Sequence, residues 1–396
     1  MRRGYALSCH GGETRRISAL VSGIAGPGMT SEALLQVQHN ERERAGRLKD
    51  RLLCCTVAGC LAGGAGAVRT ALEQEVQRQG RGAEIEVSGT GCMGLCSRGP
   101  LVRSAASDSI HTDVTPGDAK AIVDGSRSGA LTADHPFYAG QRRIILANSG
   151  HCDPERIADY IAAGGYQSLL RAVTEMTPVQ IVAAVRKSGL RGRGGAGYPA
   201  GLKWELVARQ PAHTKYVVCN ADEGDPGAFM NRSVLEGDPH RVLEGMAIAG
   251  RAVGAQQGYI YVRGEAPLAV ARLQTALEQA RGAGLLGERI FESGFNFRID
   301  VRIGAGAYVC GEETALLASI EGRRGQPISR PPYPPERGLW TQPTLINNVE
   351  TFANIPGIIE KGGDWFASIG SPASPGTKVF ALAGRVMRAG LVEVTI

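Results

Sequence analysis

A glycine-rich stretch at residues 189–206 constrains the fold of this chain more than any other feature. Six of its first thirteen residues are glycine, which is too dense for a helix or strand because glycine loses much conformational freedom there. Such a loop brings backbone N–H groups close to an anion, and Arg191, Arg193 and Lys203 add positive charge. A flexible linker would be serine-rich, and no Gly-Lys-Ser/Thr of a P-loop follows. The stretch therefore predicts a site for a phosphate-bearing cofactor.

Strand and helix patterns alternate with short connections after this loop. Strands are expected at 216–219, 258–262 and 300–303, and helices at 240–254, 266–281 and from Glu312. This alternation predicts a parallel sheet covered by helices on both faces. A helix that starts at Thr177-Pro178 should lead into the loop, and residues 376–393 indicate further β structure.

The N-terminal third predicts a smaller α+β unit. A charged, solvated helix at 31–50 should precede it, and residues 129–150 should connect it to the second domain. Within the unit we expect strands at 52–53, 85–87 and 101–102 and helices at 67–79 and 115–123. After it we expect a strand at 144–146 and a helix through Ile157–Ile161, which Asp153-Pro154-Glu155 should cap.

Two cysteine pairs lie at strand-to-loop junctions of this unit. Cys55 and Cys60 are separated by four residues, Cys92 and Cys96 by three, and 31 residues lie between the pairs. Four thiolates are the ligand set of an iron–sulfur cluster, and the neighbouring glycines let backbone N–H groups approach the sulfurs. Structural zinc and a disulfide pair remain alternatives. Cys54 adjoins Cys55, but the spacing favours Cys55.

Composition excludes several classes of protein. The net charge of +6 comes without a basic run or interleaved aromatic residues, so nucleic acid is not expected as a partner. An odd count of nine cysteines, five of them scattered, favours a reducing cytoplasm. No apolar run reaches the roughly 18 residues of a membrane span. Residues 14–20 weakly resemble a twin-arginine export signal; alternatively Met29 is the true start and 1–28 form a leader.

Four further motifs have both a structural and a functional interpretation. Residues 220–227 can be an acidic turn or hold the hydroxyl groups of a ligand, and 304–314 can be a plain strand–helix turn or a nucleotide loop. Residues 330–334 can be a stiff proline-rich loop, and 347–351 a helix start that could also bind an anion.

Taken in order, these motifs resemble one family. Residues 192–204 resemble the flavin-binding loop of the NADH-binding subunit of respiratory complex I and of the diaphorase subunits of NAD-reducing hydrogenases and NAD-dependent formate dehydrogenases, over about residues 50–396. The resemblance implies an α/β chain with a leader and charged helix (1–50), a thioredoxin-like 2Fe–2S domain (51–128), a Rossmann-like FMN- and NADH-binding domain (129–368) and the start of a truncated ubiquitin-like, SLBB-type β domain (369–396).

The resemblance also implies roles for individual residues. FMN- and NADH-binding roles fall on Gly192, Arg193, Gly194, Gly195, Tyr198, Lys203, Asn220, Asp222, Glu223, Tyr308, Gly311, Glu312, Glu313, Arg330, Tyr333, Asn347, Asn348 and Thr351. Glu223 and Glu313 would act at the reaction site, and Glu313 would favour NADH by accepting the ribose 2′-OH and repelling a 2′-phosphate. The 2Fe–2S ligands would be Cys55, Cys60, Cys92 and Cys96. The chain departs from the usual residues of the family at Tyr198, Asp225, Arg330 and Tyr333.

The implied function is that of an NADH:acceptor oxidoreductase subunit. FMN would take a hydride from NADH and pass single electrons to iron–sulfur clusters. The partners would be an iron–sulfur subunit and a hydrogenase, formate dehydrogenase or complex I module. The family also has a 4Fe–4S cluster, whose cysteines this chain lacks because it stops at Ile396. The alternative is an inactive truncated fragment that serves only as a nucleotide-binding or scaffold module.

Overall fold

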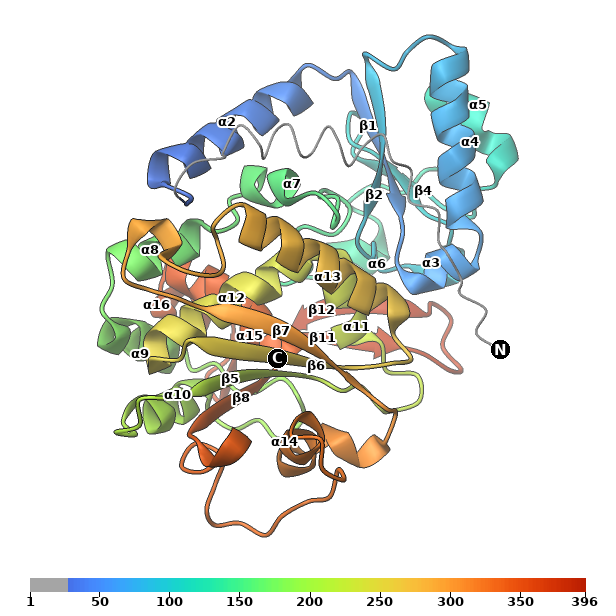
Figure 1. Ribbon diagram of the computed structural model, residues 1–396. Helices are drawn as coiled ribbons and strands as arrows, with labels where there is room; N and C mark the ends of the chain where they lie inside the picture. The colour runs from blue at the N-terminus through green and yellow to red at the C-terminus, as the bar shows by residue number, and fades with distance from the viewer. Residues whose placement is uncertain (1–27) are drawn as a thin grey trace, which may run out of the picture.

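The computed structural model of the protein describes residues 28–396 (Figure 1). Cys9, the twin-arginine-like segment and nearly all of the expected leader lie outside the described residues. The small N-terminal sheet with α4 lies at the upper right of Figure 1, beside a larger α/β unit. Helix α2 (Ser31–Gly46) runs before the small sheet, confirming the expected charged helix.

The small sheet has the strand order β2-β1-β3-β4. Its strands are β1 (Asp50–Cys55), β2 (Ile85–Thr90), β3 (Val102–Ser104) and β4 (Ser109–His111). β1 pairs parallel with β2 and antiparallel with β3, and β3 pairs antiparallel with β4. The helices of the unit are α3 (Ala58–Ala62), α4 (Ala65–Arg78) and α5 (Ala119–Val123). Leu52 and Cys54 pack with Val68 and Leu72 of α4, as the helical spacing of the apolar residues predicts.

The larger sheet is parallel throughout and has the order β7-β6-β5-β8. Its strands are β5 (Tyr216–Ala221), β6 (Gln257–Arg263), β7 (Arg298–Gly304) and β8 (Thr344–Asn348). Helices pack on both faces, which confirms the expectation from the alternating pattern. One face meets α12 (Pro239–Val253), α13 (Pro267–Gly282) and α15 (Val349–Lys361), and the other meets α14 (Glu313–Ile320).

Strand alternation explains how one apolar strand serves both faces. In β5, Val217 and Cys219 lie in the main core, whereas Val218 packs with Leu316 and Leu339 on the opposite face. The two faces of a buried parallel strand both need apolar residues, so its sequence reads as a continuous hydrophobic run.

The remaining elements surround the sheets. The helices are α6 (Pro136–Ala139), α7 (Ile157–Ala162), α8 (Gln167–Thr174), α9 (Pro178–Lys187), α10 (Ala200–Ala208), α11 (Met230–Gly237) and α16 (Gly363–Ala367). The hairpins are β9 (Gly370–Ser371) with β10 (Ser374–Pro375), and β11 (Thr377–Leu382) with β12 (Gly390–Thr395). A capping box of Thr177 and Gln180 starts α9, as expected.

Two local expectations were wrong. Residues 144–146 form a buried turn instead of a strand, because the N–H groups of Ile145 and Leu146 donate to the carboxylate of Glu393 at 3.1 and 2.9 Å. Asp153 does not cap α7, whose N-cap is Arg156. The carboxylate of Asp153 instead accepts a hydrogen bond from the hydroxyl of Ser88 at 2.8 Å, which links the small sheet to the larger unit.

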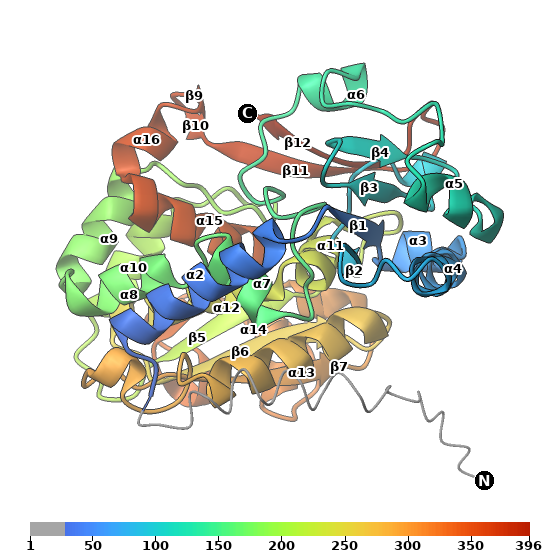
Figure 2. The same ribbon diagram turned by 90° about the horizontal axis from the view of Figure 1, so that it is seen from above.

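The hairpin β11–β12 connects the two units. In Figure 2 it extends from the region of α16 toward β3 and β4 of the small sheet. Val379 and Leu391 of the hairpin are fully buried in the main core. The hairpin is therefore packed between the units, in contact with both.

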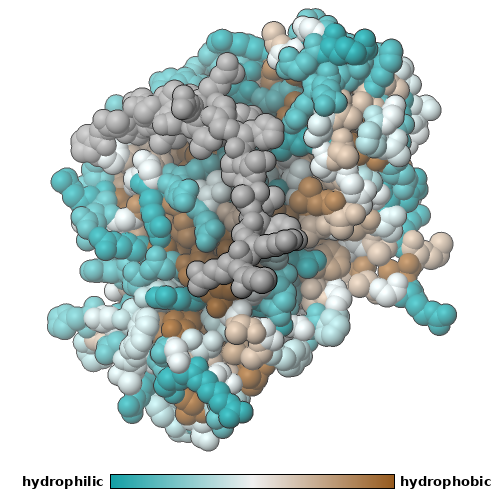
Figure 3. Space-filling model, turned by 45° about the vertical axis from the view of Figure 1, so that its right-hand side comes forward, coloured by the Kyte–Doolittle hydropathy of each residue, from teal (hydrophilic) through white to brown (hydrophobic). Residues whose placement is uncertain are grey.

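No helix within residues 28–396 is long and apolar enough to span a bilayer. Figure 3 shows a face on which hydrophilic and hydrophobic residues are interspersed.

Candidate functional site

The glycine loop lies at the carboxyl ends of β5 and β8. These strands are parallel neighbours that place Asn220 opposite Asn348 and Cys219 opposite Asn347. The loop leads into α10, whose buried Trp204 donates its indole N–H to Asn347 Oδ1 at 2.9 Å. Open parallel sheets bind ligands at this end, so the sequence-predicted residues meet where the fold favours a site.

The loop presents a row of free backbone donors. Gly192 N–H donates to the carbonyl of Tyr198 at 2.9 Å, which closes the loop. Residues 193–196 form a turn, and within residues 28–396 none of the N–H groups of 194–197 has an acceptor in good hydrogen-bond geometry. A Cβ at Gly194 would lie 3.1 Å from Cβ of Asn348, so the loop backbone lies directly against the start of α15. Unpaired N–H groups beside a helix N-terminus suit a phosphate.

The first turn of α15 fixes the loop. Asn348 is the N-cap and accepts from Glu350 N–H at 2.9 Å. The fully buried Thr351 accepts from Arg193 N–H through its Oγ1, also at 2.9 Å. Asn348 and Thr351 therefore contact the loop, and their role in binding a phosphate stays a prediction.

The arginine side chains of the loop do not point their charge at an anion, contrary to expectation. The guanidinium of Arg193 is buried and donates to three carbonyls, those of Arg191, Pro375 and Thr377, at 2.9, 2.6 and 2.9 Å. Burial lowers the pKa of Arg193. Arg191 donates to the carbonyls of Ala373 and Gly197. Loop carbonyls without regular partners need donors, and these side chains supply them. Gly201, counted with the loop, lies in α10.

The acidic segment after β5 is held in place by its own hydrogen bonds. Asn220 donates to the carbonyl of Gly311 at 2.9 Å, and Asp222 pairs with Arg263 at 3.1 Å. Burial raises the pKa of Asp222. Glu223 accepts from the N–H groups of residues 231 and 232 at 2.9 and 3.0 Å, at the start of α11. Burial also raises the pKa of Glu223.

Two adjacent glutamates at the start of α14 differ in their surroundings. Glu312 is the N-cap and accepts from the N–H groups of residues 314 and 315. Glu313 instead forms ion pairs with Lys203 at 3.1 Å and Arg330 at 2.7 Å. Lys203 also donates to the carbonyl of Ile346 at 3.2 Å. Arg330 also lies 3.9 Å from Glu312, so Glu313 differs in pairing with two cations and in capping no helix.

Exposed aromatic rings surround this ion pair. Arg330 lies 5.8 Å from the ring centre of Tyr333, and Lys203 lies 6.0 Å from that of Tyr198. Tyr308, two-thirds exposed, donates its hydroxyl to Asp225 at 2.6 Å. Three rings and two cations are suited to stacking against a nucleotide.

The four paired cysteines converge at the end of the small sheet. The sulfurs of Cys92 and Cys96 are 3.6 Å apart. Cys60, Cys92 and the N–H groups of residues 57 and 93 lie near enough to the Cys55 thiol to lower its pKa well below the ordinary value. Strand alternation sends Cys54 to the opposite face, against α4, so Cys55 joins the group.

Among the described cysteines all eight thiols are free, so a disulfide pair is not formed. Within the same residues, no group of three or more His, Cys, Asp or Glu side chains is arranged for a single metal ion. A tetrahedral zinc site needs such a group, whereas a two-iron cluster spreads its four thiolates over two metal atoms. Four converging sulfurs with backbone N–H donors fit the latter.

Sequence reasoning missed Glu350. Its carboxylate is 1% exposed and accepts from the ammonium of Lys378 and, at 2.7 Å, from Val379 N–H of β11. Burial raises its pKa to about 7. An acidic residue in the first turn is an ordinary helix signal, and only the fold shows that the hairpin covers it.

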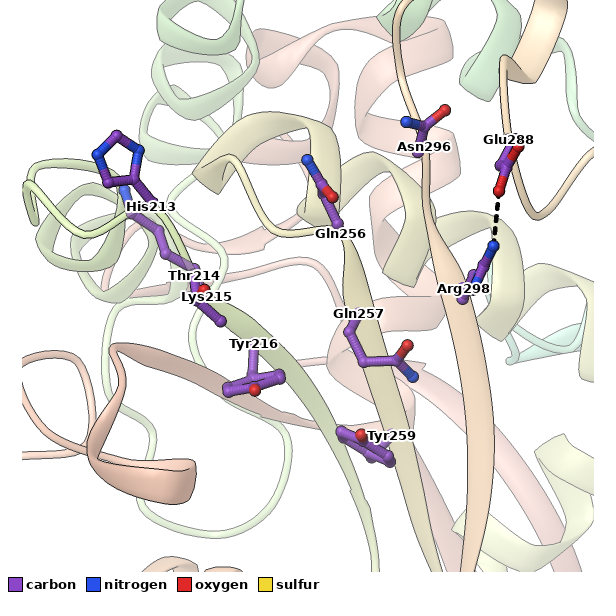
Figure 4. A pocket seen from close by; sticks show the side chains of 10 residues that line it. All are labelled: His213, Thr214, Lys215, Tyr216, Gln256, Gln257, Tyr259, Glu288, Asn296 and Arg298. Atoms are coloured by element: carbon purple, nitrogen blue, oxygen red, sulfur yellow. Dashed lines mark hydrogen bonds and ion pairs between the residues drawn. The ribbon is translucent and has the colours of Figure 1, made fainter.

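Two cavities border the larger sheet. One, of about 510 Å³, lies at the amino ends of β5, β6 and β7; Tyr216 and Gln257 line it, and Glu288 pairs with Arg298 beside it at 2.7 Å (Figure 4). The other, of about 610 Å³, lies between α14 and residues 323–341. The second is lined by the sequence neighbours of Arg330 and Tyr333, and its Trp340 packs on Tyr216 and Tyr259 near the amino ends of β5 and β6.

Comparisons with known proteins agree with this geometry. Residues 185–357 match the Nuo51 FMN-binding domain. The NADP-reducing hydrogenase subunit HndC of Solidesulfovibrio fructosivorans is 58% identical over 254 residues, which is 64% of this chain and 51% of that protein. The NADH-quinone oxidoreductase F 2 subunit of Rhizobium meliloti is 47% identical over 251 residues, 63% of this chain and 60% of that protein.

A crystal structure of an NAD⁺-reducing [NiFe]-hydrogenase in the H₂-reduced state also matches. It is 26% identical with a TM-score of 0.57, and the match covers 96% of this chain and 66% of that chain. The chain spans between half and two-thirds of the length of the curated relatives named above. Residues 185–357 are therefore similar to the Nuo51 FMN-binding domain, and the chain is similar to these F and HndC subunits over about 250 residues.

Proposed function

We propose that this chain is an NADH:acceptor oxidoreductase (diaphorase) subunit that passes electrons between NAD(H) and iron–sulfur clusters through FMN. One observation carries the proposal. The unpaired N–H groups of 194–197 lie against the N-terminus of α15 inside the segment that matches the FMN-binding family. These residues are mostly exposed, so water satisfies the donors in the free chain and an anionic ligand can take its place.

The residues present fit FMN. Its phosphate would lie on the N–H groups of the glycine loop, next to Asn348 and Thr351, which contact that loop. Asn220 and Asp222, at the end of β5, would face its hydroxyl groups. Bound FMN would accept a hydride and release electrons one at a time. The protein binds and orients it, while Glu223 stabilises the neighbouring start of α11.

The nucleotide would bind next to α14. Glu313, Arg330 and Tyr333 adjoin the larger cavity and offer a carboxylate, a cation and an aromatic face. Glu313 would accept the ribose 2′-OH, which favours NADH. The HndC relative is described as NADP-reducing, so both coenzymes have to be offered in any assay.

The cysteine group would hold a 2Fe–2S cluster through Cys55, Cys60, Cys92 and Cys96, supported by their convergence and free thiols. We further propose a cytoplasmic location and assembly with other redox subunits, such as an iron–sulfur subunit and a hydrogenase, formate dehydrogenase or complex I module, in which a 4Fe–4S cluster would serve as the next acceptor.

Anaerobic flavin titration tests the proposal. The chain should retain FMN through gel filtration, and NADH should then bleach the flavin absorbance. Retained flavin that neither NADH nor NADPH bleaches would indicate a nucleotide-binding or scaffold module without turnover. Failure to retain FMN would contradict the proposal.

A further inference from the structure

One helix joins the two proposed redox sites. The N–H groups at the start of α11 donate to Glu223, which follows β5 in the flavin region. The other end of α11, Glu236-Gly237, reaches the loops that carry the cysteines. An eight-residue helix is about 12 Å long, so the two sites lie about one short helix apart.

Glu236 holds the first cysteine loop. Its side chain is 1% exposed, and its Oε2 accepts from the N–H of Ala58 at 2.9 Å. Ala58 lies between Cys55 and Cys60 in the chain. The carboxylate oxygen Oε1 has no hydrogen-bond partner within the described residues, and Arg232 lies 3.7 Å from it. A buried carboxylate with one oxygen unpaired lowers the stability of the fold, so we expect Glu236 to have a further role.

Two further contacts fix the same region. Gly237 packs on Gly91, the residue before Cys92, so closely that a Cβ on either would lie 2.9 Å from the Cα of the other. Arg272 of α13, 4% exposed, donates to the carbonyl and hydroxyl of Thr56 at 3.0 and 2.7 Å, and also to the carbonyl of Glu236. These contacts fix the positions of both cysteine loops relative to the C-terminal end of α11.

The carboxylate and the sulfurs also interact electrostatically. Burial raises the pKa of Glu236, whereas the N–H of Ala58 and the charges of Arg232 and Arg272 act in the opposite direction. A charge on Glu236 acts in turn on the sulfurs of the loop that its carboxylate holds. In an interior with a low dielectric constant it is screened far less than in water.

We propose that Glu236 is a positioning residue that also sets the reduction potential of the cluster on Cys55, Cys60, Cys92 and Cys96. This inference rests on the proposed function, since it requires that cluster. The negative charge of Glu236 disfavours an added electron, and Arg232 beside it partly offsets this effect. The potential of the cluster thereby depends on a residue of the flavin-binding unit.

The test is an EPR-monitored redox titration of the full chain reconstituted with iron and sulfide, at fixed pH. Glu236→Gln keeps an oxygen that can accept from Ala58 N–H but removes the charge, so the midpoint potential should become more positive. Arg232→Gln, whose side chain is 38% exposed, should shift it to more negative values. Glu155→Gln is the matched control, because its half-exposed carboxylate pairs with the same Arg272 and should leave the potential unchanged.

Equal potentials in the wild-type chain and Glu236→Gln would overturn the inference. If Glu236→Gln does not retain iron, Arg232→Gln decides: a negative shift supports the inference, and no shift overturns it. Failure of the wild-type chain to assemble any cluster is a different result, which would overturn the proposed cluster itself.

Discussion

At the residue scale, the carboxylates around the site divide into two kinds. Glu223, Glu312 and Glu236 accept hydrogen bonds from backbone N–H groups and so help to build the fold. Glu313 pairs with the side chains of Lys203 and Arg330 instead. Side-chain partners can be displaced by a ligand more readily than backbone partners, so Glu313 is free to act on a bound nucleotide.

Replacing Glu313 by Gln should increase the use of NADPH. The change removes the group that repels a 2′-phosphate and leaves the cations of Lys203 and Arg330 to attract one. We expect the ratio of kcat/KM for NADPH to that for NADH to rise about tenfold or more, equivalent to roughly 1.4 kcal/mol. Glu288→Gln, at the other end of the sheet, should not change it. An unchanged ratio in the Glu313 variant would refute this role.

Replacing Gly195 by Ala should weaken FMN binding. Gly195 has φ +112°, a conformation that residues with a side chain rarely adopt, and its strain would cost roughly 1–3 kcal/mol in the binding loop. Gly66→Ala in α4 is the control, because an added Cβ there meets nothing within 4 Å. Flavin fluorescence titration should show a larger dissociation constant for FMN in the Gly195 variant only. Equal affinity in both would place the phosphate elsewhere.

At the element scale, α15 joins the glycine loop to the C-terminal hairpin. Its N-cap Asn348 lies against the loop, while Glu350, in its first turn, accepts from Lys378 and Val379 of β11. A helix N-terminus suits an anion, and here the buried Glu350 occupies part of that favourable position. The ionisation of one buried carboxyl therefore affects the region where the helix, loop and hairpin meet.

Glu350 should make stability depend on pH. Burial raises its pKa from the ordinary 4.5 to about 7, so the folded protein binds this proton more tightly than the unfolded chain. The tighter proton binding by the folded protein adds up to about 3 kcal/mol to the free energy of unfolding. This stabilisation is complete below pH 4.5 and is lost as the pH rises through about 7. Urea unfolding should show a smaller decrease between pH 5 and 7 in Glu350→Gln than in the wild type. Glu360→Gln, exposed on the same helix, should behave as the wild type; identical slopes in all three would disprove the assignment.

At the scale of the whole molecule, the hairpin β11–β12 contacts both proposed sites. Near its start, the carbonyls of Pro375 and Thr377 accept from Arg193 of the glycine loop. Near its other end, Leu391 N–H donates to the carbonyl of Gly94 at 2.7 Å, and Ser97 N–H donates to that of Ala389 at 3.0 Å. Gly94 and Ser97 flank the Cys96 position, so the hairpin should stabilise the cysteine loop.

Replacing Gly390 by Ala should loosen the cysteine loop. A Cβ at this position would lie 1.7 Å from the carbonyl oxygen of Gly94, so the backbones must separate. We expect lower iron and sulfide content per reconstituted chain with FMN retained. Met387→Ala, 98% exposed in the same hairpin, should keep the wild-type content. Full iron content in the Gly390 variant would show that the contact is dispensable.

The sequence predicts the local elements well because their signals are local. The alternating strands and helices and the capping box at Thr177 all follow from periodicity over a few residues. The errors concern partners far away in the chain. The turn at 144–146 depends on Glu393, 248 residues later, and the Arg193 side chain bonds carbonyls near residue 377. Such pairings cannot be read from spacing, because they exist only once the hairpin has packed.

The placement of the site residues was predictable only in part. The strand-end asparagines and the glycine loop could be placed because parallel strands end at the same edge of a sheet. Neither Glu236 nor Glu350 has a sequence signal beyond an ordinary helical acid, since their partners come from other units.

The most direct test of the account is to add NADH anaerobically to the chain reconstituted with FMN, iron and sulfide, and to record low-temperature EPR spectra. The account predicts a rhombic 2Fe–2S signal together with bleaching of the flavin, because the two sites lie on opposite ends of α11. Bleached flavin without an iron signal, in a sample with full iron content, would contradict the connection between the sites. No change in either would contradict the proposed activity of this chain.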